Sequence, residues 1–177
     1  MSDEAKTNVL PANAFNEGLA LELPEFRGLP SIKLDITSVQ EAERRAVEAK
    51  NVNPSSYSDL EMCFSNAFRD LKRHLATVTY QVAKTEGDLE KAKAVALFDR
   101  YPEFMKDRPK SADTADTRKG FLALDKEVSE YKDRLDSLKA LEFFLEGRVK
   151  LIERLSSHMK KSIDLIIRSG STPLYYK

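Results

Sequence analysis

The chain has 177 residues, of which 33% are charged and 8% aromatic, with no Trp and only six Gly. This composition is that of long exposed helices and argues against a compact domain of mixed helices and strands. The formal net charge of zero excludes a global field that draws the protein to nucleic acid or membrane, although residues 117–177 hold 13 Lys and Arg against 9 Asp and Glu.

Residues 1–36 carry three prolines and two glycines within a stretch that is still rich in apolar side chains. No helical period survives there, and the stretch is too apolar for a solvated tail. We expect an extended N-terminal arm with short strands around 19–23 and 32–36. This arm packs either on its own chain or on a neighbouring subunit.

A short helix is predicted over residues 38–50, where Ser38 and Glu41 have the spacing of a capping box. A long helix is predicted over residues 59–100. Its apolar positions alternate by three and four residues for more than four heptads, which is the pattern of a coiled coil. These positions are Phe64, Phe68, Leu71, Leu75, Val78, Val82, Thr85, Leu89, Ala92 and Ala96.

A second long helix is predicted over residues 117–168, with the same alternation from Phe121 to Ile166. Glu142 and Ser156 are polar residues at seam positions of this helix. The two helices flank the segment RYPEFMKDRPKSADTADT, and this order predicts an antiparallel hairpin. The expected fold is all-α: a long antiparallel coiled-coil helical hairpin over 37–177, with a short extra helix and an extended N-terminal arm.

Apolar residues also lie off the second seam, where a two-helix hairpin does not cover them. The arm, the short helix or other subunits must cover these side chains, and we favour a homo-oligomer. The residues expected at its interface are Leu141, Phe144, Leu151 and Leu155.

The cellular compartment is indicated by three features. Cys63 is the single cysteine, which suits a reducing compartment. The acidic start MSDEAKTNVLP lacks the order of a signal peptide, and no apolar run approaches the roughly 18 residues that cross a bilayer. We expect a cytoplasmic protein (in the host cytoplasm if a phage encodes it) without a membrane partner.

The sequence offers no pattern typical of an enzyme or a metal site. Neither His74 nor His158 is followed at i+3 or i+4 by a His, Cys or carboxylate. No glycine-rich phosphate loop is present. We expect a protein without catalytic residues, metal or cofactor.

Basic residues suggest two candidate surfaces for nucleic acid. In an antiparallel hairpin the start of the first helix lies beside the end of the second, and these ends carry Arg69, Lys72, Arg73, Lys160, Lys161 and Arg168. The alternative is a solvated face with internal ion pairs. The segment EGRVKLIERL adds Arg148, Lys150 and Arg154 to the same helix.

The connecting segment interleaves cations with aromatic rings. Single-stranded nucleic acid requires both, charges for its phosphates and flat rings for its bases. A plug that closes the end of the hairpin explains the rings equally well. The candidate contact residues are Arg100, Tyr101, Phe104, Lys106, Arg108 and Lys110.

The motif ALFDRYPEF, a polar loop, and the helix FLALDKEVSEYKDRLDSLKALEFFLEGRVKLIERLSSHMKKSIDLI follow one another over roughly residues 60–167. This order resembles the phage recombination-mediator family typified by UvsY. That family has a hairpin with an aromatic, charged turn and a second helix opening on an Asp-Lys-acidic-Val stretch, which residues 125–128 match. The resemblance implies a ring oligomer that binds single-stranded DNA, loads a RecA-like recombinase and displaces a single-strand-binding protein.

Two departures separate the chain from that family. Val95 and Leu97 stand where the family has a basic pair, and the first fifty or so residues have no counterpart. The alternative function is a structural or adaptor coiled-coil protein without nucleic-acid binding.

Overall fold

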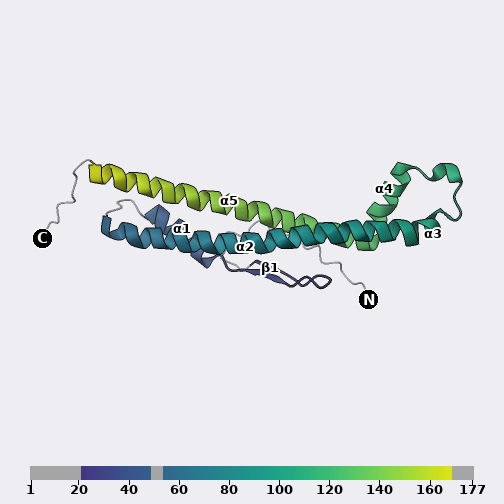
Figure 1. The fold of residues 1–177 in the computed structure, drawn as a ribbon, viewed down its shortest axis with the longest axis horizontal. Coiled ribbons are helices and arrows are strands. Elements are labelled where there is room, and N and C mark those ends of the chain that lie inside the picture. The colour runs from purple at the N-terminus through teal and green to yellow at the C-terminus, as the bar shows by residue number, and fades with distance from the viewer. Residues whose placement is uncertain (1–20, 49–53, 169–177) are drawn as a thin grey trace. The chain divides into compact units, whose positions relative to one another are not determined.

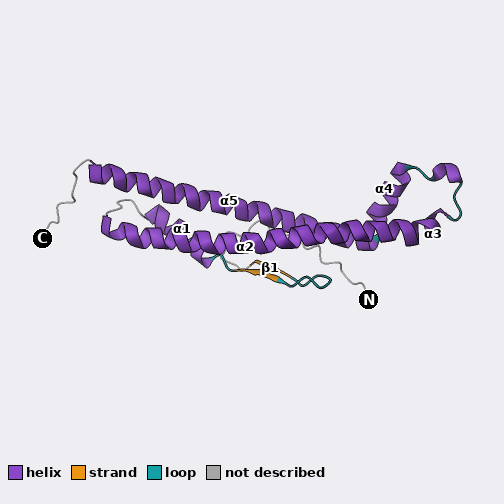
Figure 2. Ribbon diagram, in the orientation of Figure 1, coloured by secondary structure: helices purple, strands orange, loops and turns teal. Residues whose placement is uncertain are grey.

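The computed structural model describes residues 21–48 and 54–168, which are mostly helical, with one small two-stranded sheet and short connecting loops (Figure 1). Figure 2 shows the strands as the single β feature among the described helices. The predicted all-α class is thus confirmed for these residues. The elements are β1 (Leu21–Leu23), β2 (Ile32–Leu34), α1 (Thr37–Glu48), α2 (Pro54–Val95), a π-helical turn (Ala96–Arg100), α3 (Tyr101–Met105), a 3-10 turn (Lys110–Ala112), α4 (Ala115–Leu124) and α5 (Lys126–Arg168).

The described chain divides into two compact units. The turn unit is residues 78–141, and the arm unit is residues 21–48, 54–77 and 142–168. α2 and α5 each contribute one stretch to each unit. The predicted arm residues 1–20 and the predicted helix end at 49–50 lie outside the described residues.

The arm begins with a β-hairpin. β1 and β2 pair antiparallel, with Leu21 opposite Leu34 and Leu23 opposite Ile32. Leu23, Ile32 and Leu34 are buried and therefore anchor one face of the sheet. The reversal passes through Gly28 at a φ of 81°, a left-handed conformation that glycine adopts without steric cost.

α1 begins differently from the prediction. Its first residue is Thr37, whose backbone N–H donates to the carboxylate of Asp35 at 2.9 Å. Ser38 is therefore inside the helix, and its hydroxyl is buried without a hydrogen-bond partner. Glu41 pairs with Arg44 and Arg45 further along α1. The predicted capping box is wrong, because the Asp35 side chain already satisfies the amide at the helix start.

The arm packs on its own chain. Glu43 of α1 forms an ion pair with Arg148 of α5 at 2.6 Å. The Nε2 atom of His74 in α2 lies 3.0 Å from the backbone oxygen of Asp35. Of the two alternatives left open for the arm, the described residues therefore adopt packing in cis.

The core of the arm unit follows the predicted seams. The apolar residues of α2 and α5 meet in antiparallel order, since Glu61 pairs with Lys160 while Phe64 lies in a groove with Ile152. Side chains of the arm complete this core. The buried residues are Leu29, Ile36, Val39, Ala42, Leu60, Phe64, Ala67, Leu71, Leu145, Val149, Ile152, Met159 and Ile163.

The turn unit has a second apolar core with a polar layer inside it. Gln81, Thr85 and Arg134 are buried there, and Arg134 donates to Gln81 Oε1 at 3.2 Å. Burial lowers the pKa of the Arg134 guanidinium, since desolvation disfavours the charged form. The apolar members of this core are Val78, Val82, Leu89, Ala92, Ala96, Tyr101, Val128, Leu135, Leu138 and Leu141.

The four residues expected at a subunit interface differ in their exposure to solvent. Leu141 is fully buried in the turn unit, so the expectation that a hairpin leaves it uncovered is wrong. Phe144 is half-buried, with the Arg148 guanidinium 5.1 Å from its ring centre. Leu155 is half-buried, and Leu151 is 37% exposed.

Pro102 does not stop the helical path as predicted. The Tyr101 N–H donates to the Ala96 carbonyl five residues back, and this π-type turn leads directly into α3. Pro102 then lies in the first turn of α3, where a missing N–H costs no hydrogen bond.

The predicted helix over 117–168 is interrupted at Asp125, which separates α4 from α5. Asp125 has an extended backbone with a ψ of 120°, and its carboxylate accepts from the Val128 N–H at 3.1 Å. The same carboxylate accepts two hydrogen bonds from Arg100, at 2.6 and 2.9 Å. Asp125 therefore caps the start of α5 and ties it to the end of the π-helical turn.

We predict that Asp125→Ala lowers the free energy of unfolding by about 2 kcal/mol, most of it from the lost helix cap. The ion pair adds little, because Arg100 is 39% exposed and solvent screens the charge. Urea denaturation followed by circular dichroism measures this change. Asp133→Ala, at an exposed position on α5, is the control. Equal stability of the two variants would contradict the capping role.

Candidate nucleic-acid interface

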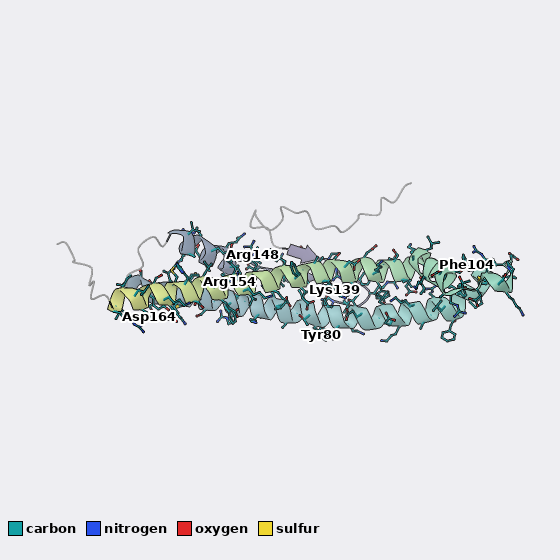
Figure 3. The ribbon with its side chains drawn as sticks, turned by 90° about the horizontal axis from the view of Figure 1, so that it is seen from above. Tyr80, Phe104, Lys139, Arg148, Arg154 and Asp164 are labelled. Carbon is teal, nitrogen blue, oxygen red and sulfur yellow. The ribbon has the colours of Figure 1, made fainter. Side chains whose placement is uncertain are left out.

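The predicted aromatic contacts of the connecting segment form an internal cluster. Tyr101 is only 8% exposed, and its hydroxyl donates to Asp113 at 2.8 Å. Its ring centre lies 6.0 Å from that of Phe104 and 5.3 Å from that of Phe121. Phe104, labelled in Figure 3, is half-exposed and has the Arg108 guanidinium 4.0 Å from its ring centre. The geometry thus favours the plug for Tyr101.

The cations of this segment divide into paired and unpaired side chains. Arg100 is held by Asp125 and also lies 3.3 Å from Glu127. Lys106 and Lys110 are exposed, and neither has an ion pair among the described residues.

Asp113, Arg118 and Phe121 hold this segment in place and were not among the sequence candidates. Arg118 donates to both oxygens of Asp113 at 2.8 and 2.9 Å. Hydrogen bonds from Arg118 and then Tyr101 lower the pKa of Asp113 to about 2. No local pattern marks these residues, because their contacts depend on how the turn closes.

The predicted basic end is only partly assembled. Lys160 pairs with Glu61 of α2 at 3.2 Å, and this ion pair raises the pKa of Lys160. Arg69 is 3.8 Å from Asp70, and the Lys72 ammonium is 5.3 Å from the Phe68 ring centre. The remaining members, Arg73, Lys161 and Arg168, are exposed.

A groove on α5 brings together basic residues that the sequence candidates included only in part. Its volume is about 350 Å³, and the lining residues are Lys150, Glu153, Arg154, Ser157, His158 and Lys161. The four basic members follow one another by four, four and three residues, so they occupy one helix face (Figure 3 labels Arg154). No ion pair to any of these four side chains occurs within the described ranges. We call this set the basic groove.

A second groove lies between α2 and α5 in the arm unit. It has a volume of about 320 Å³ and is lined by Phe64, Ser65, Phe68, Ile152, Glu153, Ser156 and Ser157. Ser156 occupies a seam position of α5, and its short side chain leaves space that a leucine would fill. Glu153 and Ser157 line both grooves, so the two are adjacent. We call this set the serine groove.

The described residues were compared with the patterns of a metal site and of a membrane-spanning helix. Over residues 21–48 and 54–168, no cluster of three or more His, Cys, Asp and Glu side chains is placed to hold a metal ion. No described helix is long and apolar enough to cross a membrane. No family model, no curated protein and no solved structure matches the chain.

The lowered pKa of Asp113 predicts an acid-sensitive turn. Because the folded pKa lies below the ordinary value, the stabilisation by this carboxylate is complete above about pH 4 and is lost as the pH falls through 2. We expect Asp113→Asn to lower the melting temperature at pH 6 and to show a smaller further fall between pH 4 and pH 2 than wild type. Asp107→Asn, at an exposed position of the same segment, should match wild type at each pH. A parallel fall for all three proteins would exclude this role.

Proposed function

We propose that the chain is a non-enzymatic accessory protein that binds single-stranded DNA in the manner of a recombination mediator, with the basic groove as its phosphate site. The observation that carries the proposal is the alignment of Lys150, Arg154, His158 and Lys161 on one helix face. Their side chains have no acidic partner among the described residues. The lysine and arginine cations among them attract the phosphates of a nucleic-acid backbone and release counterions on binding.

The dimensions of the basic groove suit a short stretch of backbone. From Lys150 to Lys161 the helix rises roughly 17 Å at 1.5 Å per residue. The adjacent serine groove offers the Phe68 ring. A single strand has unpaired bases that reach such a ring, whereas a duplex stacks its bases inside. This combination supports a single strand over a duplex.

The proposal includes assembly as a coiled-coil hairpin in a homo-oligomer. Buried seam residues in each unit support the coiled coil. Leu151 and Leu165 remain exposed on α5, which supports association with further subunits. The resemblance adds two partners, a RecA-like recombinase and a single-strand-binding protein. The single cysteine, Cys63, supports a reducing compartment such as the cytoplasm.

A second candidate function is an adaptor that binds only proteins. Phe98 and Leu124 in the turn unit are each 82% exposed, and Tyr80 is exposed as well. Large apolar side chains in water are common at protein interfaces. An adaptor would use these residues and would leave the basic groove solvated.

Salt-dependent binding tests the phosphate site. We expect the combined change Lys150→Ala, Arg154→Ala and Lys161→Ala to weaken binding to a fluorescein-labelled oligothymidylate. The slope of log affinity against log salt should become shallower by about 2, since each phosphate contact on a single strand contributes about 0.7. Fluorescence anisotropy at several salt concentrations measures the slope, and circular dichroism checks folding.

The matched control removes three exposed cations of the turn unit, Lys106, Lys110 and Lys119. This control should keep the slope of wild type. If the control alone makes the slope shallower, the phosphate site lies in the turn unit. If wild type binds no oligonucleotide, the adaptor function is favoured.

If the chain forms the proposed homo-oligomer, its molecular mass in solution exceeds that of one chain. Leu151→Asp together with Leu165→Asp should lower the oligomeric mass and keep most of the helix content, because both side chains are exposed in the protomer. Light scattering and circular dichroism measure these quantities. Ala140→Asp, at an exposed position of α5, should leave the mass unchanged. A wild-type chain that is monomeric at micromolar concentration would rule out the oligomer.

A further inference from the structure

The serine groove has a lining that distinguishes it from an ordinary gap between helices. Phe64 and Ile152 form a buried floor, being only 3% and 1% exposed, and Phe68 is half-buried beside them. The polar lining consists of three hydroxyls and one carboxylate, from Ser65, Ser156, Ser157 and Glu153. Its volume of about 320 Å³ is at the lower end of sites that hold small molecules.

We infer that the serine groove holds one unpaired base of the bound strand, and that Glu153 selects the bases with an exocyclic amino group (cytosine, adenine and guanine) over thymine. This inference rests on the proposed function, because it needs the neighbouring phosphates in the basic groove. The position of the two grooves supports it, since Glu153 and Ser157 line both and the grooves are therefore adjacent. A strand whose phosphates occupy the basic groove therefore presents a base at the mouth of the serine groove.

The chemistry of the lining fits a base better than an apolar side chain of a partner protein. An apolar occupant would remove water from the Glu153 carboxylate and the serine hydroxyls without replacing their hydrogen bonds, which is costly. A base is flat enough to stack on Phe68 and carries both donors and acceptors at its edge for the hydroxyls.

Glu153 provides the basis for selection among bases. It is the one acidic residue that lines the basic groove, where its charge repels phosphates. An ionised carboxylate only accepts hydrogen bonds, so it favours an amino group and disfavours the O4 acceptor of thymine. One such hydrogen bond at a partly solvated site corresponds to a preference of about fivefold.

Two variants separate base selection from phosphate binding. Ser156→Leu fills the serine groove with a side chain that suits its seam position and keeps Lys150, Arg154, His158 and Lys161. Glu153→Gln removes the charge and allows the amide to donate to thymine as well as accept from cytosine. Glu146→Gln makes the same change at an exposed position of α5 outside both grooves.

The test is fluorescence anisotropy with labelled oligocytidylate and oligothymidylate of equal length at pH 7.5. Wild type and Glu146→Gln should bind oligocytidylate about five times more tightly. In Ser156→Leu the ratio should fall towards one while the salt slope stays that of wild type. Glu153→Gln should reduce the ratio mainly by binding oligothymidylate more tightly, because the amide can donate to the O4 acceptor of thymine.

Equal affinity of wild type for the two oligonucleotides would overturn the inference, as would a ratio that survives both substitutions. Neither result would affect the proposed phosphate site. That site is tested separately, by the slope of log affinity against log salt in the variant that combines Lys150→Ala, Arg154→Ala and Lys161→Ala. A fall in oligomeric mass on Ser156→Leu, without a change in the ratio, would show that the groove receives another subunit. If wild type binds no oligonucleotide, both the proposed function and the inference fail.

Discussion

The heptad seam of α5 is the constraint on which the arm unit depends. Burial of Leu145, Ile152 and Met159 every seven residues fixes which face of the helix is inside. The opposite face then has the same period, so cations placed at matching intervals must also align. Lys150, Arg154 and Lys161 form a row for this reason, and the basic groove is the outer counterpart of the buried seam.

The periodic parts of the fold could be predicted from the sequence, whereas the connections could not. Heptad spacing depends on neighbours within a few residues, and the predicted seam residues are buried or half-buried throughout α2. The predictions at Pro102 and Asp125 were wrong for two reasons, an irregular helical turn at the first and a partner distant in sequence at the second. Pro102 is accommodated by a π-type turn, and Asp125 caps α5 while holding Arg100 from the other side of the turn.

The candidate site was predictable to a similar extent. The basic character of α5 was visible in the sequence, but packing decides which of its cations remain unpaired. Arg148 forms an ion pair with Glu43 of the arm, and Lys160 forms one with Glu61 of α2. A comparison of each cation with the seam would have identified Lys150 and Arg154, because they lie opposite the buried residues. Ser156 is recognisable in the sequence as a polar seam position. The groove of about 320 Å³ beside it could not be predicted, because it also requires Phe64 and Phe68 of α2 on the opposite side.

The zero net charge constrains how the proposed binding works. In the turn unit, Arg100 and Arg118 are neutralised by Asp125 and Asp113. The unpaired cations of α5 therefore add to no wider positive field, and each acts only over a short range. At physiological salt their field decays within about 8 Å, and there is no long-range steering of a strand to the groove. Three or four contacts in one protomer release few counterions and give weak, salt-sensitive binding. Tight binding therefore requires several protomers on one strand, where each bound groove raises the effective concentration of the next, so the proposed oligomer and the proposed site depend on each other.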